Sequence, residues 1–196
     1  MAKSVRQDTK DTVRREALRL FARKSYSAVS MKEIAKAVGV QASAIYNHFP
    51  SKQAILADLM SLHLETLLSA LDTAMHGISG TRERLEAFSR FHVSHHIDYP
   101  DDVFIAYMEL RSLSGDELRL IEGQRDRYER YLRQILQDGM DENLFRISDA
   151  AVHARLLLAM LTGVTVWYRE GGRLDRESVV DIYVRAAMQS VGLTYP

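Results

Sequence analysis

The spacing of apolar residues is the feature that most restricts how this chain can fold. Apolar side chains recur three and four positions apart along most of the 196 residues, and no segment shows sustained alternation of apolar and polar residues. Only three prolines interrupt the pattern. The sequence therefore predicts an all-α protein.

Nine helices follow from this spacing and from the capping and turn residues between them. In the first helix, four apolar side chains form one stripe, and four arginines lie off it on a basic face that we expect to stay free. The stripe is Val13, Ala17, Leu20 and Phe21, and the arginines are Arg14, Arg15, Arg19 and Arg23. The predicted helices span 8–24, 30–39, 42–48, 51–75, 81–98, 102–113, 116–139, 149–170 and 175–191.

The second helix has an explicit start. Ser30 is followed three residues later by Glu33, which is the pattern of a capping box, and Val29 and Ile34 are placed to form a hydrophobic staple. Gly39 predicts the left-handed residue that ends the helix. Two short helices joined by a glycine-containing turn are typical of a helix-turn-helix, whose second helix enters the major groove of DNA.

The charge of the chain is unevenly distributed, although the formal net charge is zero. Residues 1–56 contain 11 Lys and Arg against 4 acids, a charge of +7, and the remainder contains 15 against 22, a charge of −7. A basic segment ahead of an acidic body indicates that the first segment binds a polyanion. Double-stranded DNA is the partner that fits a basic helix-turn-helix.

Short and polar side chains occupy the exposed positions of the second short helix. Asn and Gln amides can pair with adenine, and small alkyl groups can contact a thymine methyl. Lys52 and the Ser30 hydroxyl lie at helix starts, where phosphate is favoured. The alternative is that these side chains form an ordinary solvated surface. The exposed positions are Gln41, Ala42, Ser43, Tyr46, Asn47 and His48.

The stretch SMKEIAKAVGVQASAIYNHFPSKQAIL, residues 30–56, closely resembles the DNA-binding module of TetR-family regulators. The resemblance implies a homodimeric transcriptional repressor, with a helix-turn-helix domain over residues 1–52 and a larger helical domain for ligand binding and dimerisation over 53–196. It implies that Ser30, Tyr46, His48 and Lys52 hold phosphates, and that Gln41, Ala42, Ser43 and Asn47 lie nearest the bases. Gln41 departs from the family, which usually has Ser or Thr capping the recognition helix. Its amide is expected to read DNA instead.

The last two predicted helices are the candidates for the dimer interface. Residues 156–167 are apolar nearly all round, which a helix tolerates only when it is covered on more than one side. Ala159 and Gly163 would let a partner approach closely. The alternative is that this is the core helix of a monomer. The predicted interface residues are Leu156, Ala159, Gly163, Val180, Tyr183, Val184 and Ala187.

Three further segments, ELRSLSGDEL, QRDRYERYLRQIL and WYREGGRLDRESVVDIYVRAAMQSVG, resemble TetR regulators that respond to acyl-CoA thioesters of fatty-acid or steroid breakdown. The resemblance implies a hydrophobic effector, with an acyl-CoA as the first choice and a non-CoA ligand of efflux or another pathway as the alternative. The predicted ligand-binding residues are Phe88, Phe91, His92, Phe104, Met108, Arg111, Tyr128, Leu132, Leu158, Leu161 and Trp167.

The phosphates of a coenzyme A would need cations, and six arginines are available in the otherwise acidic domain. The alternative to phosphate binding is that some of these arginines form i, i+4 ion pairs on an exposed helix. The candidate pairs are Asp126 with Arg130 and Glu129 with Arg133. The six arginines are Arg111, Arg119, Arg125, Arg127, Arg130 and Arg133.

Other chemistries find little support in the sequence. His92 and His96 lie one helical turn apart and His95 is adjacent, but two nitrogens do not make a metal site; Asp98 and Glu109 stay open as further ligands. No nucleophile motif, H-E-x-x-H or phosphate loop is present, which disfavours a small helical enzyme. An architectural DNA-binding protein would not need so large an acidic domain.

With no cysteine, no secretory signal and no long apolar run, we expect a cytoplasmic protein without metal, cofactor or membrane partner.

Overall fold

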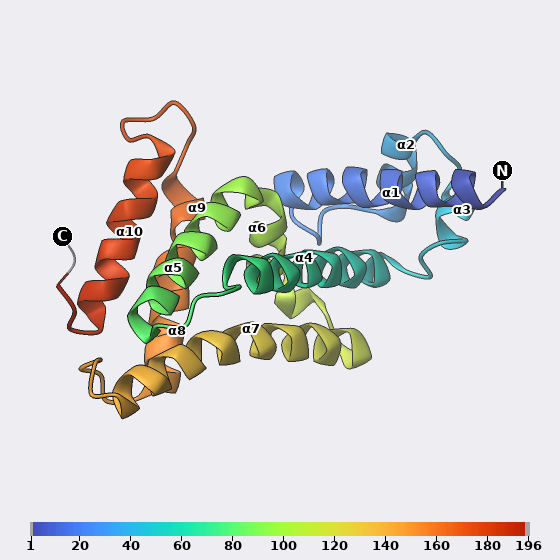
Figure 1. Cartoon of the computed structure of the whole chain (residues 1–196). Helices are drawn as coiled ribbons and strands as arrows, with labels where there is room; N and C mark the ends of the chain where they lie inside the picture. The colour runs from blue at the N-terminus through green and yellow to red at the C-terminus, as the bar shows by residue number, and fades with distance from the viewer. Residues whose placement is uncertain (1, 195–196) are drawn as a thin grey trace. The chain divides into compact units, whose positions relative to one another are not determined.

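The computed structural model describes the backbone of residues 2–194 and the side chains of residues 9–194. Every regular element in this part of the chain is a helix, which confirms the all-α prediction (Figure 1). The elements are α1 (Ala2–Lys24), α2 (Met31–Val38), α3 (Ala42–Tyr46), α4 (Lys52–Ala74), α5 (Thr81–Asp98), α6 (Pro100–Met108), the 3-10 helix η1 (Leu110–Ser112), α7 (Gly115–Asp141), α8 (Ala150–Thr162), α9 (Val164–Trp167) and α10 (Arg176–Ser190).

Two of the predicted helices are each divided in the structure. The helix expected over 102–113 ends at Met108, because Glu109 has φ −105° and ψ 5°, outside the α-helical range, and a 3-10 turn follows. The helix expected over 149–170 is interrupted at Gly163, whose N–H is shared between the carbonyls of Ala159 (3.3 Å) and Met160 (3.1 Å). Tyr168, with ψ 136°, then ends α9.

The chain forms two compact units. Unit 1 comprises Met1–Leu64 and Asp101–Gln124, and unit 2 comprises Glu65–Pro100 and Arg125–Pro196. Unit 1 therefore extends past the boundary expected at residue 52 and includes a second segment from the later part of the chain.

A bidentate ion pair fastens the beginning of α4 to α1 within unit 1. Arg14 donates from Nε (2.7 Å) and Nη2 (3.0 Å) to the carboxylate of Asp58, and Lys10 Nζ lies 3.2 Å from the same group. Although burial opposes the charge of Asp58, the Arg14 hydrogen bonds lower the pKa of its carboxyl. Arg19 pairs with Glu16, and Arg15 Nε lies 3.7 Å from the same carboxylate. The expectation of a free basic face is therefore wrong for Arg14, Arg15 and Arg19.

The core of unit 1 contains the predicted apolar side chains. The α1 stripe is buried, and so are four apolar residues of α2, α3 and the residues just after α3, while Val38 and Val40 beside them are half-buried. Burial of these side chains is the main source of stability for such short helices. The buried side chains are Val13, Ala17, Leu20, Phe21, Ile34, Ala35, Ile45 and Phe49.

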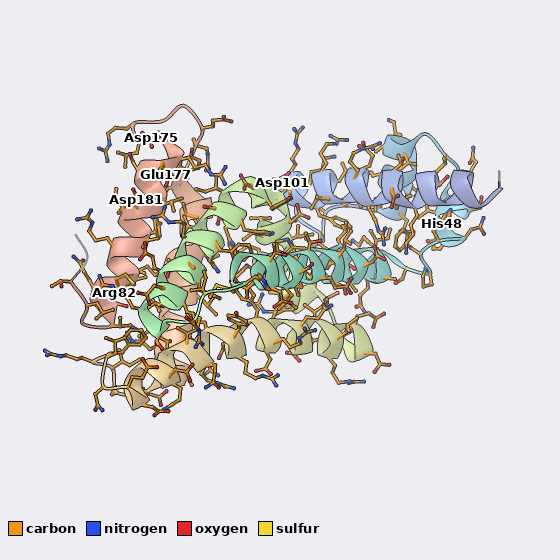
Figure 2. All side chains as sticks on the ribbon, in the orientation of Figure 1. His48, Arg82, Asp101, Asp175, Glu177 and Asp181 are labelled. Atoms are coloured by element: carbon orange, nitrogen blue, oxygen red, sulfur yellow. The ribbon has the colours of Figure 1, made fainter. Side chains whose placement is uncertain are left out.

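In unit 2, α5 and α10 run side by side (Figure 1). Arg90 of α5 links the two helices, because its guanidinium pairs with Glu177 (2.9 Å) and Asp181 (2.7 Å). Both acids lie near the start of α10 (Figure 2). The apolar face of α10 is buried in this packing. Val180 is 1% exposed, and Val184 and Ala187 are fully buried.

That burial corrects part of the predicted dimer interface. A side chain without accessible surface in the protomer has nothing left to bury against a second subunit. The prediction that Val180, Val184 and Ala187 face a partner is therefore wrong, and they belong to the core of unit 2.

Two segments are long and apolar enough, by length and composition, to cross a membrane: α4 and the stretch Ala150–Trp167. The apolar window of α4 is 56% buried, which is typical of a core helix, whereas that of the second segment is only 28% buried. Residues 150–167 therefore present an apolar surface.

Candidate nucleic-acid interface and effector core

The start of α2 is built by the predicted capping box. Ser30 Oγ accepts the Glu33 N–H (3.2 Å), and the Glu33 carboxylate accepts the Ser30 N–H (2.9 Å). The backbone hydrogen bond from Ser30 is the main cause that lowers the pKa of Glu33. Val29 and Ile34, the expected staple, are both buried. Two N–H groups at the helix start are thus satisfied within the chain.

Gly39 makes the turn between the two short helices. Its φ of 80° is left-handed, as predicted, and its N–H and that of Val40 both bond to the carbonyl of Ala35 (2.9 and 3.0 Å). This tight turn leads directly to α3. Ile45 of α3 and Phe49, three residues after the helix ends, are buried in unit 1. The local geometry is that of a helix-turn-helix.

Gln41 occupies the N-cap position of α3 without capping it. Its backbone is extended (φ −71°, ψ 147°), and within the described chain its side chain makes no capping hydrogen bond. The residue is exposed. The long amide therefore projects from the start of the candidate recognition helix.

The predicted DNA-reading side chains share the outer side of this element. Gln41, Ser43, Tyr46 and Asn47 are exposed, with Tyr46 at 52%. Ala42 and His48 are half-buried, and His48 lies just past α3 (Figure 2). The structure brings these six residues together on α3 and the residues next to its two ends. Their contacts with DNA remain a prediction.

Lys52 has a structural role that the sequence did not reveal. Its ammonium group donates to the carbonyls of Tyr26 (2.8 Å) and Val29 (2.7 Å), and it lies 4.2 Å from the centre of the Tyr26 ring. The first residue of α4 is therefore fastened to the α1–α2 turn, residues 25–29. The predicted phosphate contact of Lys52 would be made in addition to these bonds.

A polar group lies inside the aromatic core of unit 2. His92 of α5 is fully buried, and its two ring nitrogens lie 3.0 Å from the Tyr128 hydroxyl of α7 and 3.1 Å from the Thr162 hydroxyl of α8. Phe88 packs nearby, with its ring centre 5.4 Å from that of Tyr128. Burial, with a smaller effect of His95, lowers the pKa of His92 to about 3. His92 is therefore neutral at ordinary pH.

The ring of His92 already makes polar and stacking contacts within the chain. Both ring nitrogens of His92 are within hydrogen-bonding distance of hydroxyls, and its ring stacks on that of His96 at 3.7 Å. Among the residues described, no group of three or more His, Cys, Asp or Glu side chains is placed to hold a metal ion.

The predicted ligand residues do not all lie in one unit. Phe88, His92, Tyr128, Leu132 and Leu161 are buried in unit 2, and Phe91 and Leu158 are half-buried there. Phe104, Met108 and Arg111 belong to unit 1 and are exposed.

Trp167 lies on the surface instead of in the buried cluster. It is 50% exposed, and its indole N–H donates to the Tyr183 hydroxyl of α10 (2.9 Å). We therefore group Trp167 with the exposed apolar surface of α8 and α9.

Two of the α7 arginines pair with acids on their own helix. Arg130 pairs with Asp126, as the ion-pair alternative expected, and Arg119 pairs with Asp116, three residues away, which was not expected. The expected Glu129–Arg133 pair is replaced, because Glu129 accepts a hydrogen bond from Arg155 of α8 (3.1 Å). A pair from a neighbouring helix cannot be found from i, i+4 spacing.

An apolar stripe runs along α8 and α9. From Val152 to Val166, successive members are three or four residues apart, so that they share one helical face, and Trp167 is four residues after Gly163. We call them the α8–α9 stripe: Val152 (53% exposed), Leu156 (60%), Ala159, Gly163, Val166 (76%) and Trp167 (50%). Large apolar side chains exposed in a row are typical of a surface that binds a partner.

Comparison with known proteins gives two family matches. Residues 14–59 match the family described as bacterial regulatory proteins, tetR family. Residues 79–191 match the family described as tetracyclin repressor-like, C-terminal domain. The first match contains the helix-turn-helix, and the second contains α5 to α10.

Individual relatives extend over most of the chain. The HTH-type transcriptional repressor KstR2 of Mycobacterium tuberculosis is 24% identical over 183 residues, 89% of this chain and 88% of that protein. The TetR family transcriptional regulator PfmR of Thermus thermophilus has a solved structure with 30% identity and a TM-score of 0.80, covering 91% of this chain and 98% of that one. AibR, solved with isovaleryl coenzyme A and operator DNA, has 24% identity and a TM-score of 0.83, covering 91% and 97%.

Proposed function

Since this chain belongs to the TetR family of transcriptional repressors, we propose that it is a homodimeric repressor that leaves its operator when a hydrophobic effector, most simply an acyl-CoA thioester, binds. Members of this family regulate transcription and are not enzymes, so the alternative of a helical enzyme is excluded. A DNA-binding regulator acts where the chromosome is, which in a bacterium is the cytoplasm.

The geometry around α3 carries the DNA-binding part of the proposal. A capped α2 and a left-handed Gly39 turn hold α3 with its polar side chains outward, in a segment of charge +7. Base edges would meet Gln41, Ala42, Ser43 and Asn47, while phosphates would meet Ser30, Tyr46, His48 and Lys52. Phosphate contacts position the helix, and base contacts select the sequence.

The α8–α9 stripe supports the homodimer. Two copies of the stripe would bury each other's apolar side chains around a two-fold axis, with Ala159 and Gly163 allowing close approach. Tyr183 of α10, half-buried and hydrogen-bonded to Trp167, would lie at the edge of this interface. Dimerisation sets the distance between two recognition helices, which is what a two-half-site operator requires.

The buried cluster of unit 2 supports an apolar effector that also carries a hydrogen-bonding group. Phe88, Leu132 and Leu161 are fully buried in the protomer, so they would supply apolar surface only where the cluster opens around the effector, and the neutral His92 with the Tyr128 hydroxyl would then supply a donor and an acceptor. A thioester has both an acyl chain and a carbonyl acceptor. KstR2 and AibR, whose fold this chain shares, are a repressor and a protein solved with an acyl-CoA, respectively.

One observation favours the second candidate, an effector without coenzyme A. Arg119 and Arg130 are already paired with acids on their own helix, which leaves fewer cations for CoA phosphates.

The experiment is a reciprocal binding measurement. Operator duplexes are first selected from a random library with the purified protein. Their affinity is then measured with long-chain acyl-CoA, steroid acyl-CoA, free coenzyme A and the free acid. We expect a thioester to weaken operator binding, and the operator to weaken thioester binding by the same factor, because coupling between two sites is reciprocal.

The outcomes separate the two candidates. If no thioester changes the affinity but the free acid does, the effector is a non-CoA ligand. A coupling factor of one for a compound that binds the protein would contradict the ligand-responsive mechanism, and failure to select any duplex would contradict DNA binding itself.

A further inference from the structure

The turn between α1 and α2 is held in a conformation that its own sequence does not favour. Ser25, which follows α1, has φ 69°, a left-handed conformation that is unfavourable for a non-glycine residue. Such a conformation persists when the surroundings impose it. The next residue, Tyr26, makes the contacts that do so, and α2 begins only a few residues later, after the Ser30 cap.

Both backbone polar groups of Tyr26 are bound by distant charged side chains of unit 1. Its carbonyl accepts from Lys52 Nζ (2.8 Å) at the start of α4, and its N–H donates to Glu109 Oε1 (3.0 Å). Glu109 lies 83 positions further along the chain, between α6 and η1. The turn is thus anchored on one side by the DNA-binding segment and on the other by the later segment of unit 1.

Glu109 is itself fixed in this position. It is only 8% exposed, and a carboxylate in such a place needs hydrogen bonds to offset lost hydration. Oε1 accepts from Tyr26, and Oε2 accepts from the hydroxyl of Ser112 in η1 (2.9 Å). Burial and then the Glu109 charge raise the pKa of the Tyr26 phenol, which agrees with a carboxylate close to that residue. Glu109 and Ser112 both lie in the segment ELRSLSGDEL, residues 109–118. The contact with Tyr26 gives the Glu109 carboxylate a structural role, and Ser112 holds that carboxylate in place.

We propose that Glu109 is a positioning residue for DNA binding, which fixes the α1–α2 turn through the N–H of Tyr26 and thereby sets where α2 and the recognition helix α3 lie. A shift of the segment after α6 would then be felt at the helix-turn-helix through one hydrogen bond. The inference rests on the DNA-binding part of the proposed function and does not depend on which effector binds.

The test compares two substitutions at one position in the full-length protein. Glu109→Gln keeps an acceptor oxygen at nearly the same reach, whereas Glu109→Ala removes it. We expect the alanine variant to lose about tenfold in affinity for the duplex selected with the wild-type protein, as for loss of one charge-assisted hydrogen bond, and the glutamine variant to keep most of it. Glu122→Ala, an exposed carboxylate on α7, is the matched control and should bind like the wild type.

Amide hydrogen exchange and urea unfolding separate positioning from simple stabilisation. In Glu109→Ala, we expect faster exchange of the peptide covering residues 22–30 with the folded protein otherwise intact. Three results would overturn the inference: unchanged operator affinity of the alanine variant, whether or not its stability falls; equal weakening by alanine and glutamine; or unchanged protection of the turn. If the wild type selects no duplex, the DNA-binding function fails and this inference fails with it; a failure confined to the Glu109 variants leaves that function standing.

Discussion

His92 shows how its surroundings can define the state of a single residue. Its imidazole lies in an apolar core, where the charged form would lose its hydration without an acidic partner. The ring therefore remains neutral and can offer one donor and one acceptor to the hydroxyls of Tyr128 and Thr162. The same burial opposes protonation of His92, so the residue destabilises the folded protein at low pH.

We predict that His92 makes the protein less stable as the pH falls. The unfolded chain binds a proton near pH 6.5, whereas the folded protein resists it until about 3. Between these values the unfolded state holds more protons, so the free energy of unfolding falls on acidification, by up to about 1.4 kcal/mol per pH unit. The measurement is urea unfolding between about pH 7 and 5 at fixed protein concentration.

The matched variants are His92→Gln, which keeps hydrogen-bonding groups but does not titrate, and His76→Gln at an exposed position. His92→Gln should make the free energy of unfolding depend less on pH. The pH dependence that remains would come from His95 and His153, because burial also lowers the pKa of each. A slope equal in the wild type and His92→Gln would refute the assignment.

At the scale of elements, the α1–α2 turn and the start of α4 act as one structure. Lys52 joins them through the carbonyls of Tyr26 and Val29, and Arg14 joins α1 to α4 through Asp58. These ties explain why compact unit 1 continues to residue 64. The long α4 helix therefore begins inside the DNA-binding unit instead of after it.

We predict two separate effects of Lys52→Ala. Loss of the hydrogen bonds from Lys52 to the carbonyls of Tyr26 and Val29 should lower the free energy of unfolding by about 1–3 kcal/mol. Loss of the expected phosphate contact should weaken binding similarly on all DNA sequences and reduce the salt dependence by about one contact. Urea unfolding measures the first effect, and operator affinity at several salt concentrations measures the second.

Arg173→Ala, in the exposed loop before α10, controls for loss of a positive charge far along the chain. An unchanged salt slope in Lys52→Ala would mean that Lys52 only fastens the turn. Unchanged unfolding would mean that its two carbonyl contacts contribute no stability.

At the scale of the whole molecule, we expect the exposed α8–α9 stripe to decide how many copies bind DNA. We predict that Leu156→Arg, which places a charge in the middle of the stripe, gives a folded monomer whose operator affinity falls on the order of 100-fold, because two linked half-site contacts become one. Analytical ultracentrifugation gives the oligomeric state, and circular dichroism gives the fold.

Leu120→Arg is the matched control, since Leu120 is an apolar side chain of unit 1 with similar exposure, 54%. It should leave the dimer intact. If Leu156→Arg still sediments as a dimer, the interface lies elsewhere.

Residue spacing was sufficient to predict the features that depend on near neighbours. The helical content, the Ser30–Glu33 capping box and the left-handed Gly39 each arise from groups a few residues apart, so their spacing can be read directly. The helix-turn-helix was predictable for the same reason. Gln41 could also be recognised as a non-capping residue, because the cap position is defined locally.

Which helix faces are covered and which distant groups meet depends on packing, and residue spacing could not predict it. Val184 and Trp167 are both apolar residues late in the chain, yet one is fully buried by the packing of α10 on α5 and the other is half exposed. The bond between Glu109 and Tyr26 joins residues 83 positions apart. Spacing predicts that a helix has an apolar face, but burial and long-range hydrogen bonds depend on which other segment packs against that face, and this is a property of the folded chain as a whole.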